Sequence, residues 1–262
     1  MLKNCIARLA FGFGVALMAF PTDATAEITV MISGGFFLAY QEVLPEFERD
    51  TGIAVTTLSG ASQGTGPKTI RAQLERGVQA DVVILSREGL DELIAAGRVV
   101  SGSDTELARV PLAAAVRQGS PKPDISSVDA LKRTLLDARM ISMPESTSGQ
   151  FLKNVVFPKI GIADKVSLKI VPRGIDSTAL LASGGSDLAL GPVSELVNQP
   201  NVELVGPLPD DVQLVQVFTA AIVNASPHQE EAKRLTEFLA SNRTTAAIRK
   251  SGMEPVGNIR MR

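Results

Sequence analysis

ITVMISGGFFLAYQEVLPEFERDTGIAVTTLSG, residues 28–60, is the stretch from which the fold can be predicted. Residues 28–33 are mainly apolar and end in a serine, which is typical of a buried strand. Residues 37–52 then carry apolar side chains at helical spacing and end in Gly52, a residue type that often terminates helices. Residues 53–60 form a second strand-like run, so the stretch predicts a strand–helix–strand unit.

The same alternation continues along the first half of the chain. A helical pattern follows at residues 67–77, with Pro67 at a favoured first-turn position and Gly77 past the helix end. A strand-like run at residues 80–86 and a helical pattern at residues 88–97 come next. This order predicts a parallel sheet with helices on both faces.

The second half of the chain contains two long extended runs, at residues 107–119 and 212–226. One long strand that enters this half and another that leaves it predict two α/β lobes joined by two crossover strands, with a ligand cleft between the lobes. The predicted domains are lobe I at residues 27–109 plus 218–262 and lobe II at residues 110–217. The shorter predicted helices and strands of this half lie at residues 128–138, 139–143, 154–161, 169–173, 177–185, 187–191 and 230–252.

The N-terminal segment, residues 1–26, has the layout of a secretory signal peptide. Lys3 and Arg8 precede an apolar run from Leu9 to Phe20, and the small residues Ala24-Thr25-Ala26 suit a cleavage site. The run is too short to span a bilayer stably. We therefore expect cleavage near Ala26 and export, which in a Gram-negative cell means the periplasm.

Composition excludes several classes of function. Without the predicted signal segment the chain has 24 basic and 27 acidic residues, a net charge of about −3, and it has no Trp and one Tyr, so nothing favours nucleic-acid binding. Cys5 lies in the signal segment and His228 is the only histidine, so no metal site is expected. We expect a monomer without cofactor, nucleic-acid partner or membrane insertion.

Three polar, glycine-containing segments follow predicted strands: residues 33–37, 59–66 and 144–150. In open α/β sheets, ligands bind outside the carboxyl ends of the strands, so these segments are expected to face the cleft. Free backbone N–H groups and the helix dipole at such places favour an anion. Ordinary helix capping by Ser and Thr is the alternative interpretation of each segment.

The sequence resembles the periplasmic molybdate-binding type of solute-binding protein along nearly the whole mature chain. The segments that carry the resemblance include GVQADVVILS at residues 77–86, PESTSGQFLKNVVFPKIGI at residues 144–162 and VSEL at residues 193–196. The resemblance implies a type II periplasmic binding protein fold. In that fold each lobe is a mostly parallel sheet flanked by helices, and the ligand lies in the cleft.

The resemblance also implies binding positions, with two departures from the family pattern. The family's first-loop serine falls at Gly35, although Ser33 is two residues earlier, and its late tyrosine falls at Pro192. An oxyanion pocket has thus lost a hydroxyl at two positions. The other expected binding residues are Ser62, Ser148 and Gly149 at family positions, with Thr65, Ser146 and Ser194 as further donors.

Cationic residues near these segments suggest what replaces the lost hydroxyls. Arg71 follows the second segment and Arg173 lies between a predicted strand and helix. A planar guanidinium matches a carboxylate well, so at least one of the two is expected to bind a substrate carboxylate. The alternative for Arg71 is a surface ion pair with Glu75, four residues further along a helix.

Two classes of function follow from the resemblance. One is a receptor that delivers molybdate or an organic polycarboxylate to an ABC permease. The other is an enzyme on the same frame that interconverts trans- and cis-aconitate by moving an allylic proton, which needs a base and an acid. The expected catalytic residues are Glu145, Glu195 and Lys68, with Tyr40 as a further candidate base.

Overall fold

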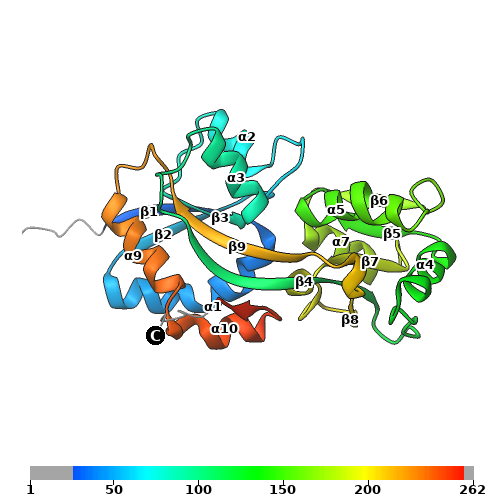
Figure 1. The fold of residues 1–262 in the computed structure, drawn as a ribbon. Helices are drawn as coiled ribbons and strands as arrows, with labels where there is room; N and C mark the ends of the chain where they lie inside the picture. The colour runs from blue at the N-terminus through cyan, green and yellow to red at the C-terminus, as the bar shows by residue number, and fades with distance from the viewer. Residues whose placement is uncertain (1–25, 257–262) are drawn as a thin grey trace, which may run out of the picture.

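The computed structural model describes residues 26–256 as two lobes connected by two long strands (Figure 1). The predicted signal peptide, residues 1–26, lies outside the described residues except for Ala26. Within the described range, no helix is both long and apolar enough to cross a membrane.

Lobe I is built on parallel strands in the order β2-β1-β3, each followed by a helix. The predicted alternation of strands and helices in the first half is therefore confirmed. Helices near the C-terminus return to cover the same lobe (Figure 1). The elements of lobe I are β1 (Glu27–Ile32), α1 (Gly34–Thr51), β2 (Ala54–Ser59), α2 (Ile70–Glu75), β3 (Val82–Ser86), α3 (Arg87–Ala95), α9 (Gln229–Leu239), η3 (Asn242–Thr244), α10 (Thr245–Lys250) and β10 (Glu254–Pro255).

The prediction for helix α2 was wrong at its start. Pro67 was expected in the first helical turn, but the helix begins at Ile70. The Thr69 hydroxyl accepts a hydrogen bond from the backbone N–H of Ala72 at 3.1 Å and so caps the helix. Pro67 therefore lies in the preceding loop.

The core of lobe I has two layers, one on each face of the sheet. Successive side chains of a strand point to opposite faces. Val30 and Ile32 of β1 pack with Phe36 of α1, whereas Met31 joins the opposite cluster with Leu90 of α3. This packing fixes the start of α1 at the carboxyl end of β1.

Lobe II repeats the arrangement, with β5 parallel to both β6 and β7. Strands β8 and β10 were not predicted. The residues of β8 are partly buried, except exposed Pro207, so no alternation of buried and exposed side chains marks that strand. The elements of lobe II are α4 (Val128–Asp137), β5 (Ile141–Pro144), α5 (Thr147–Phe151), the π-helical segment η1 (Leu152–Val156), α6 (Phe157–Lys159), β6 (Leu168–Val171), α7 (Gly174–Ala182), β7 (Leu188–Pro192), α8 (Val193–Leu196), β8 (Val202–Pro207) and η2 (Asp210–Val212).

Two antiparallel strands, β4 (Thr105–Arg117) and β9 (Val215–Ile222), run side by side between the lobes (Figure 1). β4 pairs with β9 up to Pro111 and then with β7 and β8 from Leu112 and Ala113 onward. The predicted pair of crossover strands is thus present. The predicted domain boundaries at 109/110 and 217/218 stay predictions.

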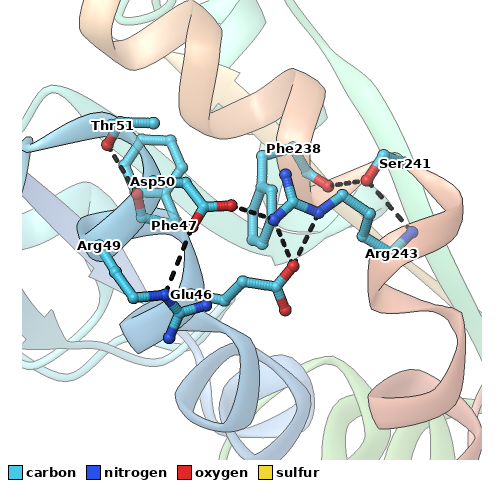
Figure 2. Close-up of polar contacts among 8 residues, drawn as sticks. All are labelled: Glu46, Phe47, Arg49, Asp50, Thr51, Phe238, Ser241 and Arg243. Carbon is cyan, nitrogen blue, oxygen red and sulfur yellow. Dashed lines mark hydrogen bonds and ion pairs between the residues drawn. The ribbon is translucent and has the colours of Figure 1, made fainter.

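One polar cluster ties the C-terminal helices to α1 (Figure 2). The Arg243 guanidinium pairs with the carboxylates of Glu46 and Asp50, and its Nε lies 2.7 Å from Glu46 Oε1. The Arg243 Cζ also lies 5.0 Å above the Phe238 ring, which packs on Phe47 with 5.5 Å between ring centroids. The guanidinium therefore joins charged and aromatic contacts at one place.

Replacing Arg243 with glutamine is expected to lower the melting temperature of the protein slightly, on the order of 2 °C, because the cluster is exposed. Arg243 holds the pKa of Asp50 below its usual value. A lowered carboxyl pKa stabilises the folded state at neutral pH, and this stabilisation is lost as the pH falls through the lowered value. The difference in melting temperature should therefore shrink in acid, as calorimetry can measure. Lys233→Gln, which changes an exposed side chain of α9, serves as the control.

Candidate functional site

A cavity of about 400 Å³ lies between the two lobes. Its walls are the first turns of α1, the loop after β2, the segments after β5, β6 and β7, and part of β9. The cavity thus opens at the carboxyl ends of strands from both lobes, as predicted for the ligand cleft. Its size suits a small organic molecule or ion.

The N-terminus of α1 forms one wall. Ser33 donates its backbone N–H to Ile84 O at 2.8 Å, which fixes the turn from β1 into the helix. The Ser33 hydroxyl is buried and has no hydrogen-bond partner among the described residues. Gly35 lies against Phe218, since a Cβ atom on Gly35 would be 2.0 Å from the ring. A buried hydroxyl without a partner is costly unless a ligand or water satisfies it.

The loop after β2 contributes Ser62 to the wall. Its hydroxyl accepts the backbone N–H of Ser86 at 3.0 Å, so it is held in place at the N-terminus of α3. The Ser62 carbonyl lies against Gly89, where a Cβ atom would be only 2.3 Å from it. The sequence therefore fixes this loop by packing and by hydrogen bonding.

Arg173 provides the positive charge in the cavity wall. Its Nε and Nη2 donate to the Asp176 carboxylate at 3.1 and 2.8 Å, and this contact raises the pKa of Arg173 and lowers that of Asp176. The Arg173 side chain is 46% exposed, so the ion pair is only partly shielded. The guanidinium keeps donor capacity for a second anion.

Glu195 is the carboxyl in the cavity wall. It lies in α8, and its Oε2 is buried without a hydrogen-bond partner in the described part of the chain. Burial raises the pKa of Glu195 to about 7. A carboxyl with this pKa can both accept and release a proton near neutral pH. Within residues 26–256, Arg173 and Glu195 are the only titratable residues that line the cavity.

Gln216 is a lining residue that the sequence interpretation missed. It lies on β9 opposite Val110, is 3% exposed, and its Oε1 is buried without a partner among the described residues. A glutamine between Val215 and Val217, inside the predicted strand that leaves the second half of the chain, was a signal that could have identified it. Its amide can donate to a ligand, like the nearby Asn198 and Gln199.

About half of the predicted site residues meet in this cavity. Each of them lies within a few residues of a strand end or at the first turn of a helix, where backbone groups stay free. The predicted residues that line the cavity are Ser33, Gly35, Ser62, Ser146, Arg173, Ser194 and Glu195, and Pro192 lines it as well. The predicted residues that do not line it are Thr65, Lys68, Arg71, Glu145, Ser148 and Gly149.

Glu145 and Thr65 form a contact between the lobes beside the cavity. Thr65 Oγ1 donates to Glu145 Oε1 at 3.0 Å. A second such contact is the buried hydrogen bond between the hydroxyls of Ser86 and Thr147, at 2.7 Å. These bonds join the lobes in the arrangement described, so the carboxylate of Glu145 is engaged there and not in the cavity wall.

Lys68 and Arg71 were expected at the ligand, but the structure places both outside the cavity lining. Lys68 is exposed, and its charge helps to lower the pKa of Asp176 across the cleft. Arg71 Nε lies 2.9 Å from Glu75 Oε1, which is the surface ion pair considered as the alternative. The i,i+4 spacing on α2 explains this pairing.

Ser148 and Gly149 have packing roles in α5. Ser148 is fully buried, and its hydroxyl lies 3.5 Å from that of Ser146. A Cβ atom on Gly149 would be 1.8 Å from the Pro144 carbonyl oxygen, so glycine permits the close approach of α5 to β5.

Tyr40, a further candidate base, lies in the core of lobe I. Its hydroxyl shares a hydrogen bond with Thr57 Oγ1 at 2.8 Å, and burial raises its pKa to about 12. A phenol that holds its proton this strongly cannot serve as a base at neutral pH. Tyr40 therefore stabilises the packing of α1 on β2.

Two sequence comparisons connect the chain with known proteins. The family model described as bacterial extracellular solute-binding protein matches residues 28–254. A protein from Pseudomonas sp. named aconitate isomerase is 38% identical over 232 residues, which cover 87% of this chain and 88% of the relative. The molybdate-binding protein ModA of Azotobacter vinelandii is 23% identical over 94% of this chain and 97% of that protein.

Solved structures with the same fold include two anion-binding proteins. The sulfate-binding protein SubI of Mycobacterium tuberculosis superimposes with a TM-score of 0.72 at 22% identity and covers 88% of this chain and 87% of its own. The periplasmic molybdate-binding protein of Azotobacter vinelandii gives a TM-score of 0.66 at 18% identity, with 86% and 98% covered. These likenesses confirm the predicted two-lobed binding-protein fold.

Proposed function

The chain belongs to the bacterial extracellular solute-binding protein family, and on this premise we propose that it is an aconitate isomerase that acts in the cleft between its lobes. The 38% identity along 87% of the chain supports the activity. The site observation that carries the proposal is Glu195, a carboxyl whose pKa lies near neutrality in the cavity wall. The proposed location is the periplasm.

The reaction needs one proton to move across an allylic system. Aconitate has a CH₂ group next to a carbon–carbon double bond. Removal of one CH₂ proton gives a carbanion whose charge spreads over the allylic carbons and a neighbouring carboxylate. Addition of a proton at the other allylic carbon shifts the double bond and gives the other isomer. One C–H bond breaks and one forms, so no oxidant, reductant or net proton is needed.

Glu195 is the proposed group that moves the proton. Its ionised form takes the proton from the CH₂ carbon, and its protonated form returns a proton to the other carbon. A pKa near 7 keeps both forms accessible at neutral pH. Since Arg173 is the only other titratable residue that the described part of the chain contributes to the lining, we assign both steps to the one carboxyl.

Arg173 is the proposed site for a substrate carboxylate. The guanidinium offers a fork of donors to it and stabilises the charge that develops next to the allylic carbons. The unpartnered hydroxyls of Ser33 and Ser194 donate to the remaining carboxylates. The N-termini of α1 and α7, which lie in the wall, add favourable dipoles.

Glu145 and Lys68 receive different roles from those expected. Glu145 holds the lobes together through its hydrogen bond with Thr65. Lys68, exposed and near Asp176, raises the positive potential at the cleft mouth and attracts an anionic substrate.

A receptor for an oxyanion is the second candidate, because sulfate- and molybdate-binding proteins share the fold. The two candidates separate in one experiment. Purified protein is incubated with trans-aconitate, without added metal or nucleotide, and cis-aconitate is followed by proton NMR. Turnover supports the isomerase. Tight binding of molybdate measured by calorimetry, with no turnover of aconitate, would overturn it.

A single proton-transferring group predicts retention of isotope. We expect trans-aconitate that carries deuterium at its CH₂ carbon to give cis-aconitate with part of that deuterium at the new CH₂ group, because Glu195 carries the label across. NMR of product from a brief reaction in ordinary water measures this fraction. Product without any deuterium at that carbon, even at the earliest times, would indicate separate acid and base groups.

A further inference from the structure

We propose that Gly34 and Gly174 are positioning residues, which hold the Glu195 carboxyl between the first turns of α1 and α7. The inference rests on the proposed function, in which Glu195 moves the proton. It concerns how the fold places that carboxyl at the cavity wall.

The carboxyl occupies the space that side chains at both glycines would need. A Cβ atom on Gly174 would lie 2.0 Å from Glu195 Oε2, and one on Gly34 would lie 2.6 Å from Oε1. Beyond their own chain neighbours and helices, the nearest atoms to both Cβ positions belong to Glu195. Packed atoms cannot approach so closely, so any larger residue must displace the carboxyl.

The backbone does not require glycine at either position. Neither Gly34 nor Gly174 has a positive φ, and each is the first residue of a helix. Alanine has the higher helix propensity, by about 1 kcal/mol in a helix interior, so glycine brings no local advantage there. The structure explains the glycines at positions 34 and 174 by the space that the Glu195 carboxyl occupies there.

The two glycines come from different lobes. Gly34 opens α1 in lobe I and Gly174 opens α7 in lobe II, while α8, which carries Glu195, contacts both helices. The carboxyl is therefore enclosed from both sides only when the lobes take the arrangement described. Bringing the lobes together would place the proton-transferring group as well as enclose the substrate.

The chain offers a matched control in Gly191. A Cβ atom there would lie 3.9 Å from Glu195 Oε2, which is an ordinary van der Waals contact. Gly191→Ala adds the same methyl group beside the same carboxyl without displacing it. We expect this variant to keep the kcat and KM of the wild type.

The test compares Gly34→Ala, Gly174→Ala and Gly191→Ala. For the first two we expect kcat to fall about 100-fold, because the reacting group is displaced by about 1 Å. KM should stay within about threefold, because the substrate contacts remain. The apparent pKa in the kcat profile should shift, since the carboxyl surroundings change. In a Glu195→Gln background the glycine substitutions should cost nothing further, because they act through that side chain.

Three outcomes would overturn the inference: an unchanged kcat in Gly34→Ala and Gly174→Ala, a rise in KM alone, or an equal loss in Gly191→Ala. If Gly174→Ala does not fold, the pair Gly174→Ala with Glu195→Asp is expected to fold, because aspartate is shorter by one methylene. A pair that also fails to fold would count against the inference.

The inference and the proposed function can fail separately. Absence of turnover by the wild type would overturn the proposed function. NMR titration of ¹³C-labelled glutamate carboxyls tests positioning without turnover. Gly174→Ala should move the pKa of Glu195, and Gly191→Ala should leave it unchanged. Identical titration of Glu195 in the wild type and in Gly174→Ala would overturn the inference.

Discussion

Glu195→Gln is expected to lower kcat for aconitate isomerisation by about 10³-fold or more, because the amide keeps the size of the side chain but cannot carry a proton. Steady-state kinetics with trans-aconitate measures the loss. Glu145→Gln is the comparison, since it weakens a contact between the lobes and should cost less than about tenfold. A greater loss in Glu145→Gln than in Glu195→Gln would move the proton transfer to Glu145.

Glu195→Gln should also change how the free energy of unfolding depends on pH. The pKa of Glu195 is raised from 4.5 to about 7, so the folded protein binds more protons than the unfolded chain between these values. Stability of the wild type therefore falls as the pH rises from about 4.5 to about 7, by up to roughly 3 kcal/mol. Glu195→Gln lacks this loss. Urea unfolding at about pH 5 and about pH 8 measures the free energy of unfolding of each protein. An equal change in this free energy between the two pH values for the wild type and for Glu195→Gln would contradict the prediction.

Arg173→Ala is expected to cost about 3 kcal/mol, or roughly 150-fold in kcat/KM, through a higher KM from lost substrate binding and a lower kcat from lost stabilisation of the developing charge. The guanidinium is the positive charge in the cavity wall. Its removal also frees the negative charge of Asp176 beside an anionic substrate. Arg173→Lys should recover only part of the loss, because an ammonium group lacks the planar fork.

Arg71→Ala is the matched control for Arg173→Ala. Arg71 also forms a partly exposed ion pair with a carboxylate on its own helix, but it lies outside the cavity lining. We expect the kcat/KM of the Arg71→Ala variant to stay within about twofold of the wild-type value. An equal loss in both variants would mean that the measured effect reflects overall charge and not contact with substrate.

Much of the fold could be predicted because its signals are local. The strands β1 and β3 are mainly apolar, and Gly52 ends α1 with a φ of 70°. The polar segments at strand ends could also be predicted to line a cleft, and Ser33 and Ser62 lie there. β8 escaped prediction because none of its residues is fully buried, so no clear alternation of apolar and polar side chains marks the strand.

The chemistry of the site could be predicted only in part. Glu195 and Glu145 were equal candidates, since each follows a predicted strand. The first has a buried oxygen without a partner, whereas the second accepts a hydrogen bond from Thr65 of the other lobe. Both facts depend on neighbours that are distant in the sequence.

The sequence by itself determined the order of most strands and helices, because apolar spacing and helix ends depend on residues within a few positions of one another. Only the tertiary structure decided that Gly34, Gly174 and Glu195 meet at one cavity wall. The crossover strands bring these residues together, and burial among them raises the pKa of Glu195. Desolvation acts over a few ångströms of space and not along the chain, so no local pattern could reveal it.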